Sequence, residues 1–154
     1  MSENLKSDIN ALYNWLSAND FSNFYAVTIT MKQNWNGMVL DQTLASKNLR
    51  HFINLMNQAV YGNAYRRHGK SLQVIPILEQ SAWDRLHYHI SIEKPDRLSE
   101  ADFMDLLKES WSRTDFARKQ MEIKKIFSRG WIQYCLKNPS SAQTIDIENL
   151  KLHR

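Results

Sequence analysis

The sequence predicts an α+β fold, in which a ferredoxin-like (βαββαβ) antiparallel sheet carries its helices on one face. Three observations support this class. Some segments repeat apolar residues at helical spacing, whereas others alternate apolar and polar residues. The two kinds of segment interleave along the chain, which favours helices packed against one sheet. Only four glycines and three prolines interrupt the 154 residues, so most of the chain is expected in regular structure.

The first half of the chain is predicted to hold two helices and a strand. Residues 4–18 carry apolar side chains at helical spacing, and residues 24–31 are aromatic and β-branched, as in a strand. A polar loop around Asn36 follows. Residues 43–61 form the clearest helix, which Gly62 is expected to end. Its apolar stripe consists of Leu49, Phe52, Ile53, Met56 and Val60.

The next segments predict a pair of strands and another helix. Residues 72–79 and 86–93 are expected to be strands around a turn near residues 82–84. Ser99 and Asp102 have the spacing of a capping box and predict the start of a helix.

The last part of the chain is less regular. A short strand is predicted near residues 119–126, and Ser128 is expected to cap a helix that runs to Lys137. Pro139 ends this helix. The tail from residue 140 to 154 is weakly patterned and predicts no element.

Bulk properties indicate one soluble domain spanning residues 1–154. A net charge of +4 and a pI of about 9.2 permit nucleic-acid binding without demanding it. No apolar run approaches the roughly 20 residues of a membrane span. The single cysteine, Cys135, excludes an internal disulfide and suits a reducing compartment. The polar start of the chain differs from a signal peptide, so a cytoplasmic location is expected.

A candidate metal site is indicated by two histidines on one strand. His87 and His89 alternate with apolar residues, so both imidazoles point to the same face of the sheet. An isolated pair of this kind is typical of a solvated strand. Glu79 changes this interpretation, because a turn near residue 83 places it opposite His87. Gln80 and Asp84 remain alternatives for the third ligand. Such a set suits Mn²⁺ or Mg²⁺, and Zn²⁺ less selectively.

A candidate nucleophile lies in the last predicted helix. Tyr134 and Lys137 are three residues apart, so they share one helix face. A tyrosine hydroxyl is a weak nucleophile, but a metal ion on the phosphate and a nearby lysine charge ease its attack. The pair alone is equally typical of the boundary of an amphipathic helix.

The order of three short motifs resembles the HUH endonuclease superfamily, most closely its rolling-circle replication initiators (Rep proteins). FYAVTIT, at residues 24–30, loosely resembles the first Rep motif. LHYHISI, at residues 86–92, is similar to the motif of two histidines around a hydrophobic residue, and YCLK, from residue 134, matches the tyrosine motif. The resemblance covers about residues 24–138.

The resemblance implies a metal-dependent enzyme that nicks and joins single-stranded DNA at an origin or at the end of a mobile element. His87, His89 and Glu79 would hold the divalent metal on the scissile phosphate. Tyr134 would attack that phosphate and leave a 5′-phosphotyrosine link and a free 3′-OH. Lys137 would position or neutralise charge near the site.

Departures from the family pattern narrow this expectation. Gly130 and Asn138 stand where a second tyrosine would be expected one helical turn from Tyr134, which predicts a single-tyrosine enzyme. No helicase domain fits after Asn138, so the protein would use a separate helicase or act as a nuclease alone. A single-tyrosine transposase, a non-catalytic ferredoxin-like nucleic-acid-binding module and a metal-stabilised protein without catalysis remain the alternatives.

Several basic residues are candidate contacts for DNA phosphates. They are Lys32, Arg66, Arg67, Lys70, Arg85, Lys124 and Lys125. Residues 64–71 match a loose phosphate-loop pattern, but a helix precedes them and a strand follows, so no nucleotide cofactor is expected. Trp35 and Trp83 lie in predicted loops, where they would either stack on unpaired bases or cover the edge of the core.

Overall fold

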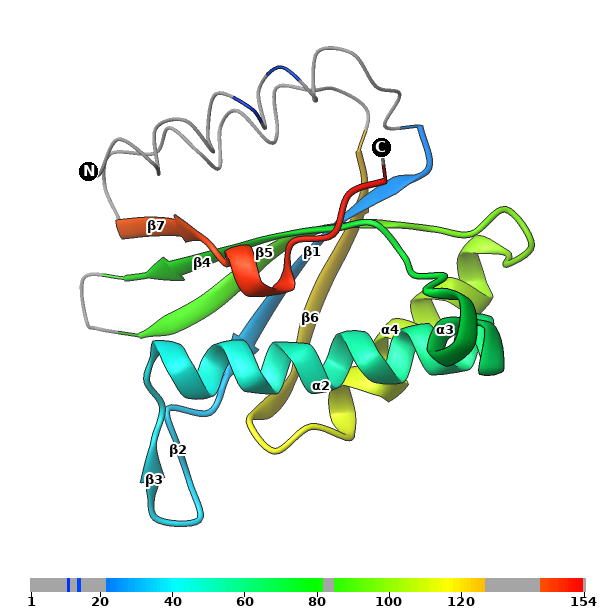
Figure 1. Ribbon diagram of the computed structural model, residues 1–154. Helices are drawn as coiled ribbons and strands as arrows, with labels where there is room; N and C mark the ends of the chain where they lie inside the picture. Colours follow the sequence, from blue (N-terminus) through cyan, green and yellow to red (C-terminus); the bar gives the residue numbers. More distant parts are fainter. Residues whose placement is uncertain (1–10, 12–13, 15–21, 82–84, 127–141, 154) are drawn as a thin grey trace.

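The computed structural model describes residues 11, 14, 22–81, 85–126 and 142–153 (Figure 1). Five strands form one antiparallel sheet in the order β6-β1-β5-β4-β7, and a separate hairpin pairs β2 with β3. The elements are β1 (Phe24–Met31), β2 (Asn34–Trp35), β3 (Met38–Val39), α2 (Gln42–Tyr61), α3 (Asn63–His68), β4 (Val74–Gln80), β5 (Leu86–Glu93), α4 (Glu100–Ser112), β6 (Ala117–Lys125), β7 (Ala142–Ile145) and the 3₁₀ helix η1 (Ile147–Asn149).

The predicted α+β class is confirmed. Figure 1 shows α2 and α4 on the same face of the sheet, and the order of β6, β1, β5 and β4 is consistent with a ferredoxin-like arrangement. Within the described residues, no helix combines the length and the hydrophobicity needed to cross a lipid bilayer.

The main core lies between this face of the sheet and the two long helices. Alternate residues of the central strands point into it, because side chains one position apart in a strand face opposite ways. They include Val27, Ile29, Tyr88, Ile90 and Ile92, all at most 1% exposed. From the helices, Phe52 meets Trp111 edge to face, with ring centroids 5.5 Å apart.

Replacing Phe52 with alanine is expected to lower the free energy of unfolding by about 3–5 kcal/mol, because it removes a fully buried ring and leaves a cavity beside Trp111. Denaturant titration measures this change. His51→Ala, at the exposed neighbouring position of α2, is the matched control and should stay within about 0.5 kcal/mol of the wild type. A loss below about 1 kcal/mol for Phe52→Ala would contradict this packing.

Side chains cap the starts of α2 and α4, and of these helix ends the stop at Gly62 and the cap at Ser99 were predicted. The Asp41 side chain accepts a hydrogen bond from the backbone of Leu44 at the start of α2, and Gly62 ends this helix with a φ of 54°. Ser99 accepts from the backbone N–H of Asp102 at the start of α4, as the capping-box spacing predicted.

Five elements were not predicted, namely β2, β3, α3, β7 and η1. The loop after β1 is a hairpin that turns at Asn36 and Gly37, both with positive φ. The helix α3 follows α2 directly and ends at Gly69, which is left-handed. The tail, expected to be without an element, forms β7 and η1. The predicted N-terminal helix lies outside the described residues except for Ala11 and Asn14, which are helical, and the predicted tyrosine-bearing helix lies wholly outside them.

Candidate metal site

The candidate site lies on the sheet face opposite the main core, where β1 and β4 end and β5 begins. Strand pairing sets four side chains in one row across the sheet. Thr30 pairs with His87, His87 with Glu79, and Glu79 with Gln143 of β7. Residues paired in this way have neighbouring side chains on the same face. His89 lies two residues along β5 and therefore also on this face.

Glu79, His87 and His89 converge, as the sequence predicted. One carboxylate oxygen of Glu79, Oε1, is 2.8 Å from His87 Nε2, and the other, Oε2, is 3.3 Å from His89 Nε2. The two imidazole rings are 5.1 Å apart and nearly perpendicular. All three side chains are between 14% and 22% exposed, so the cluster is partly buried and can still be reached from solvent.

The choice between Glu79 and Gln80 follows from the strand register. Gln80 pairs with Leu86, which points into the main core, so Gln80 lies on the opposite face from the histidines. Asp84 lies outside the described residues.

The donor set fits a divalent metal ion. One ligand atom from each residue can be chosen so that all three lie within 4.8 Å of one another. Ligands at right angles around an ion at about 2.1 Å are about 3.0 Å apart, close to the 2.8 Å and 3.3 Å between Glu79 and the two histidines. Two nearby buried oxygens, Thr30 Oγ1 and Gln143 Oε1, have no hydrogen-bond partner among the described residues. Since buried polar atoms are normally satisfied, these two oxygens are further groups that a polar ligand at the site could satisfy.

Burial prepares His89 to bind a metal. Desolvation lowers the pKa of His89, and the charge of Glu79 only partly opposes this shift. The imidazole is therefore neutral near pH 7, as a metal ligand must be. Its other nitrogen, Nδ1, lies 3.3 Å from Thr28 Oγ1. A neutral ring that donates a hydrogen bond from Nδ1 to this hydroxyl would keep the lone pair of Nε2, on the side of Glu79, free for a metal ion.

Two contacting residues were missed by the sequence reasoning. Thr28 lies in the strand predicted over residues 24–31 and was not among the predicted site residues, although it faces His89 in the register of β1 and β5. Gln143, in the tail, donates from Nε2 to Glu79 Oε2 at 2.7 Å. The alternation of β1 could have revealed Thr28, whereas no local pattern marks the strand that carries Gln143.

The candidate DNA-binding residues are all exposed and separate into two groups. Lys32 follows β1, Arg85 precedes β5, and Lys124 pairs with Ala26 on the face of the histidines. Arg66, Arg67 and Lys70 belong to α3 and the loop after it, at the far end of α2. Because α2 has 20 residues, it is about 30 Å long, and its length separates the second group from the start of this helix (Figure 1).

The structure also places the other candidates. Trp35 packs against the core, with its ring centroid 6.0 Å from that of Phe116, which favours the interpretation that it covers the core edge. Residues 64–71 contain most of α3 and lead into β4, so no helix begins at Gly69 as a phosphate loop requires. Trp83, Tyr134 and Lys137 lie outside the described residues.

Comparison of the chain with protein-family models, curated proteins and solved structures finds no match.

Proposed function

We propose that this protein is a metal-dependent, single-tyrosine HUH endonuclease that nicks and rejoins single-stranded DNA. The observation that supports the proposal most is the convergence of Glu79, His87 and His89 on one face of the sheet. The histidine pair and the acidic residue come from neighbouring antiparallel strands, with Glu79 directly opposite His87.

In the proposed reaction, the hydroxyl oxygen of Tyr134 attacks the scissile phosphorus, and the bond between phosphorus and the 3′ oxygen breaks. The phenolic proton passes to the departing oxygen, which leaves a free 3′-OH and a 5′-phosphotyrosine link. Mn²⁺ or Mg²⁺ held by Glu79, His87 and His89 would polarise the phosphate as a Lewis acid. Lys137 would offset negative charge at the phosphate. Because the link preserves a phosphodiester, a 3′-OH can later rejoin the strands without ATP.

The biological role that we propose is initiation of replication for a plasmid, phage or related mobile element, with a separate helicase as partner. FYAVTIT favours this role over that of a single-tyrosine transposase, which uses the same chemistry. The finer assignment of the sheet as ferredoxin-like is part of the same proposal.

A non-catalytic nucleic-acid-binding module is less well supported. Such modules present aromatic side chains on an open sheet for base stacking. In the described strands of the five-stranded sheet, Phe24, Tyr25 and Tyr88 are all buried. Tyr88 points to the helix side, and its hydroxyl donates to Asp146 at 2.7 Å. The face of the histidines therefore offers metal ligands and threonines in place of stacking platforms.

The proposal is tested by mixing the purified protein with short single-stranded DNAs from the origin or ends of its own element, with and without Mn²⁺. A protein band of lower mobility on a denaturing gel, formed only with metal, is expected. Measurable DNA binding without this band for any strand would instead favour the binding module.

Lys124→Ala is expected to weaken binding of a short single strand severalfold and to reduce the slope of log K against log salt by about 0.7. The reason is that Lys124 lies on the face of the histidines with its side chain 72% exposed, so its charge can meet a phosphate there. Arg67→Ala, an equal charge change on α3, should alter the binding of the same strand little. Fluorescence anisotropy at several salt concentrations measures both. Equal losses would mean that the DNA also runs over α3.

A further inference from the structure

The segment from residue 142 to 149, here called the strap, contacts Glu79 on one face of the sheet and Tyr88, the residue between the two histidines, on the other. It consists of β7, Asp146 and η1. β7 pairs with β4 along four residues, from Gln80 with Ala142 to Ile77 with Ile145. The strap therefore lies beside the strand that supplies Glu79.

On the face of the histidines, the strap contributes Gln143. Its Nε2 donates to Glu79 Oε2 at 2.7 Å, and the same carboxylate oxygen lies 3.3 Å from His89. A glutamate side chain has several rotatable bonds and loses conformational entropy when it is fixed in one geometry. A donor on one oxygen reduces this freedom and holds the carboxylate plane between the two histidines.

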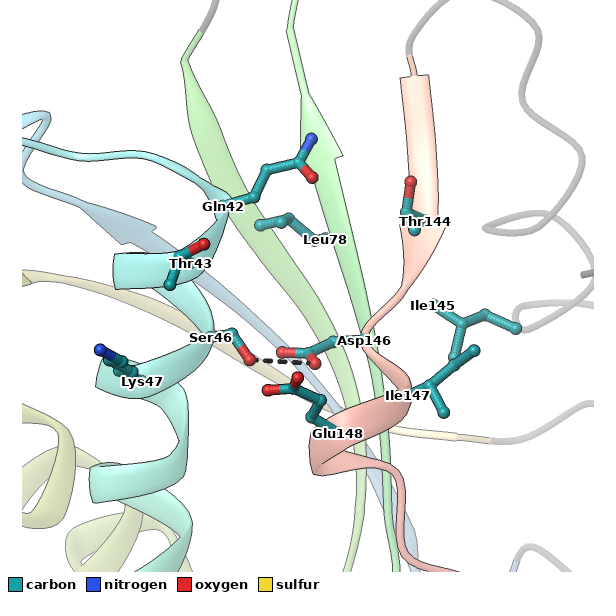
Figure 2. A pocket seen from close by; sticks show the side chains of 10 residues that line it. All are labelled: Gln42, Thr43, Ser46, Lys47, Leu78, Thr144, Ile145, Asp146, Ile147 and Glu148. Atoms are coloured by element: carbon teal, nitrogen blue, oxygen red, sulfur yellow. Dashed lines mark hydrogen bonds between the residues drawn. The ribbon is translucent and has the colours of Figure 1, made fainter. Parts of the chain in front are cut away.

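On the helix side, the strap is anchored through Asp146. Figure 2 shows Asp146 beside Ser46 of α2, whose hydroxyl donates to Asp146 Oδ1 at 3.1 Å. Asp146 Oδ2 accepts from the hydroxyl of Tyr88 at 2.7 Å and from the Asn149 side chain at 2.8 Å. Tyr88 is the residue between the two histidines, so this contact fixes the strap to the metal-binding strand itself.

We propose that Gln143 is a positioning residue for the metal site, and that the strap sets the metal affinity by holding Glu79 in its binding geometry. The inference rests on the proposed function, since it presumes a divalent ion at Glu79, His87 and His89. Partners of metal ligands commonly change affinity by about 10–100-fold when they are removed. A residue about 50 positions beyond the histidines thereby becomes part of the site.

The test measures Mn²⁺ binding to the full chain by isothermal titration calorimetry. Gln143→Met keeps the length and approximate volume of the side chain but removes the donor. We expect it to raise the dissociation constant for Mn²⁺ about 10–100-fold, with the melting temperature nearly unchanged. Thr144→Val is the matched control, because Thr144 is the next residue of β7 and faces the other way, into the pocket of Figure 2. It should bind Mn²⁺ as the wild type does.

Wild-type affinity in Gln143→Met would overturn the inference and leave the proposed function intact. An equal loss of affinity in Thr144→Val would also overturn it, since this would indicate a general loosening of β7. A wild-type protein that does not bind Mn²⁺ would remove the proposed metal site and the inference together, so the two failures can be told apart.

Discussion

Replacing Tyr134 with phenylalanine is expected to abolish the covalent protein–DNA product, with a fall in nicking rate of at least about 10³-fold. The substitution removes only the phenolic oxygen, which is the atom that attacks phosphorus in the proposed reaction. Affinity for single-stranded DNA should stay within about twofold of the wild type, because binding rests on phosphate contacts and not on the nucleophile. A denaturing gel with labelled DNA reports the product, and anisotropy reports the affinity.

The control for this substitution is Tyr65→Phe. Tyr65 lies on α3, at the far end of α2, and its hydroxyl donates to Asn54 and takes no part in the metal site. This variant should form the covalent product as the wild type does. A product that persists in Tyr134→Phe would exclude Tyr134 as the nucleophile, and mass spectrometry of the linked peptide would then identify the residue that attacks.

Replacing His87 with alanine is expected to lower metal-dependent nicking by at least about 10²-fold. In the proposed site His87 would supply one of three ligand atoms, and its loss would leave Glu79 and His89 to hold the ion alone. Titration with Mn²⁺ should show a matching loss of affinity. The fold should survive, because His87 is partly exposed and lies on the face of β5 opposite the main core.

Two further results bear on the role of His87. His51→Ala, at an exposed position of α2, should retain full activity. A chelator should remove the activity of the wild type while lowering its melting temperature only slightly. If the chelator greatly lowers the melting temperature, and the protein with its metal does not nick DNA, the metal stabilises the protein without taking part in catalysis.

The metal cluster could be predicted because it depends on local patterns. The alternation of β5 separates His87 and His89 from Tyr88, and a short turn fixes which residue of β4 faces them. The long helix α2 was equally predictable, since its apolar stripe and Gly62 define both its face and its end. In each case, the deciding residues lie within one element or across one hairpin.

The strap could not be predicted, because the residues that fix its position lie far away in the sequence. β7 has only four residues, and it pairs with β4, more than 60 positions earlier in the chain. Its order comes from hydrogen bonds to an existing strand and from contacts such as that of Asp146 with Tyr88, not from its own periodicity. The contact between Gln143 and Glu79 has the same origin. A pattern search along the chain does not detect a partner that is fixed by tertiary pairing.

The outer strand β6 has a consequence for how the protein behaves at high concentration. An unpaired strand edge is a template for a strand of another molecule, and charged side chains are a common protection against such association. β6 is one of the two outer strands of the described sheet, and it exposes Arg118, Lys119, Lys124 and Lys125. Neutralising all four charges in order to study DNA binding would also remove a barrier to aggregation. Single substitutions therefore separate recognition from solubility more cleanly than a charge-free strand would.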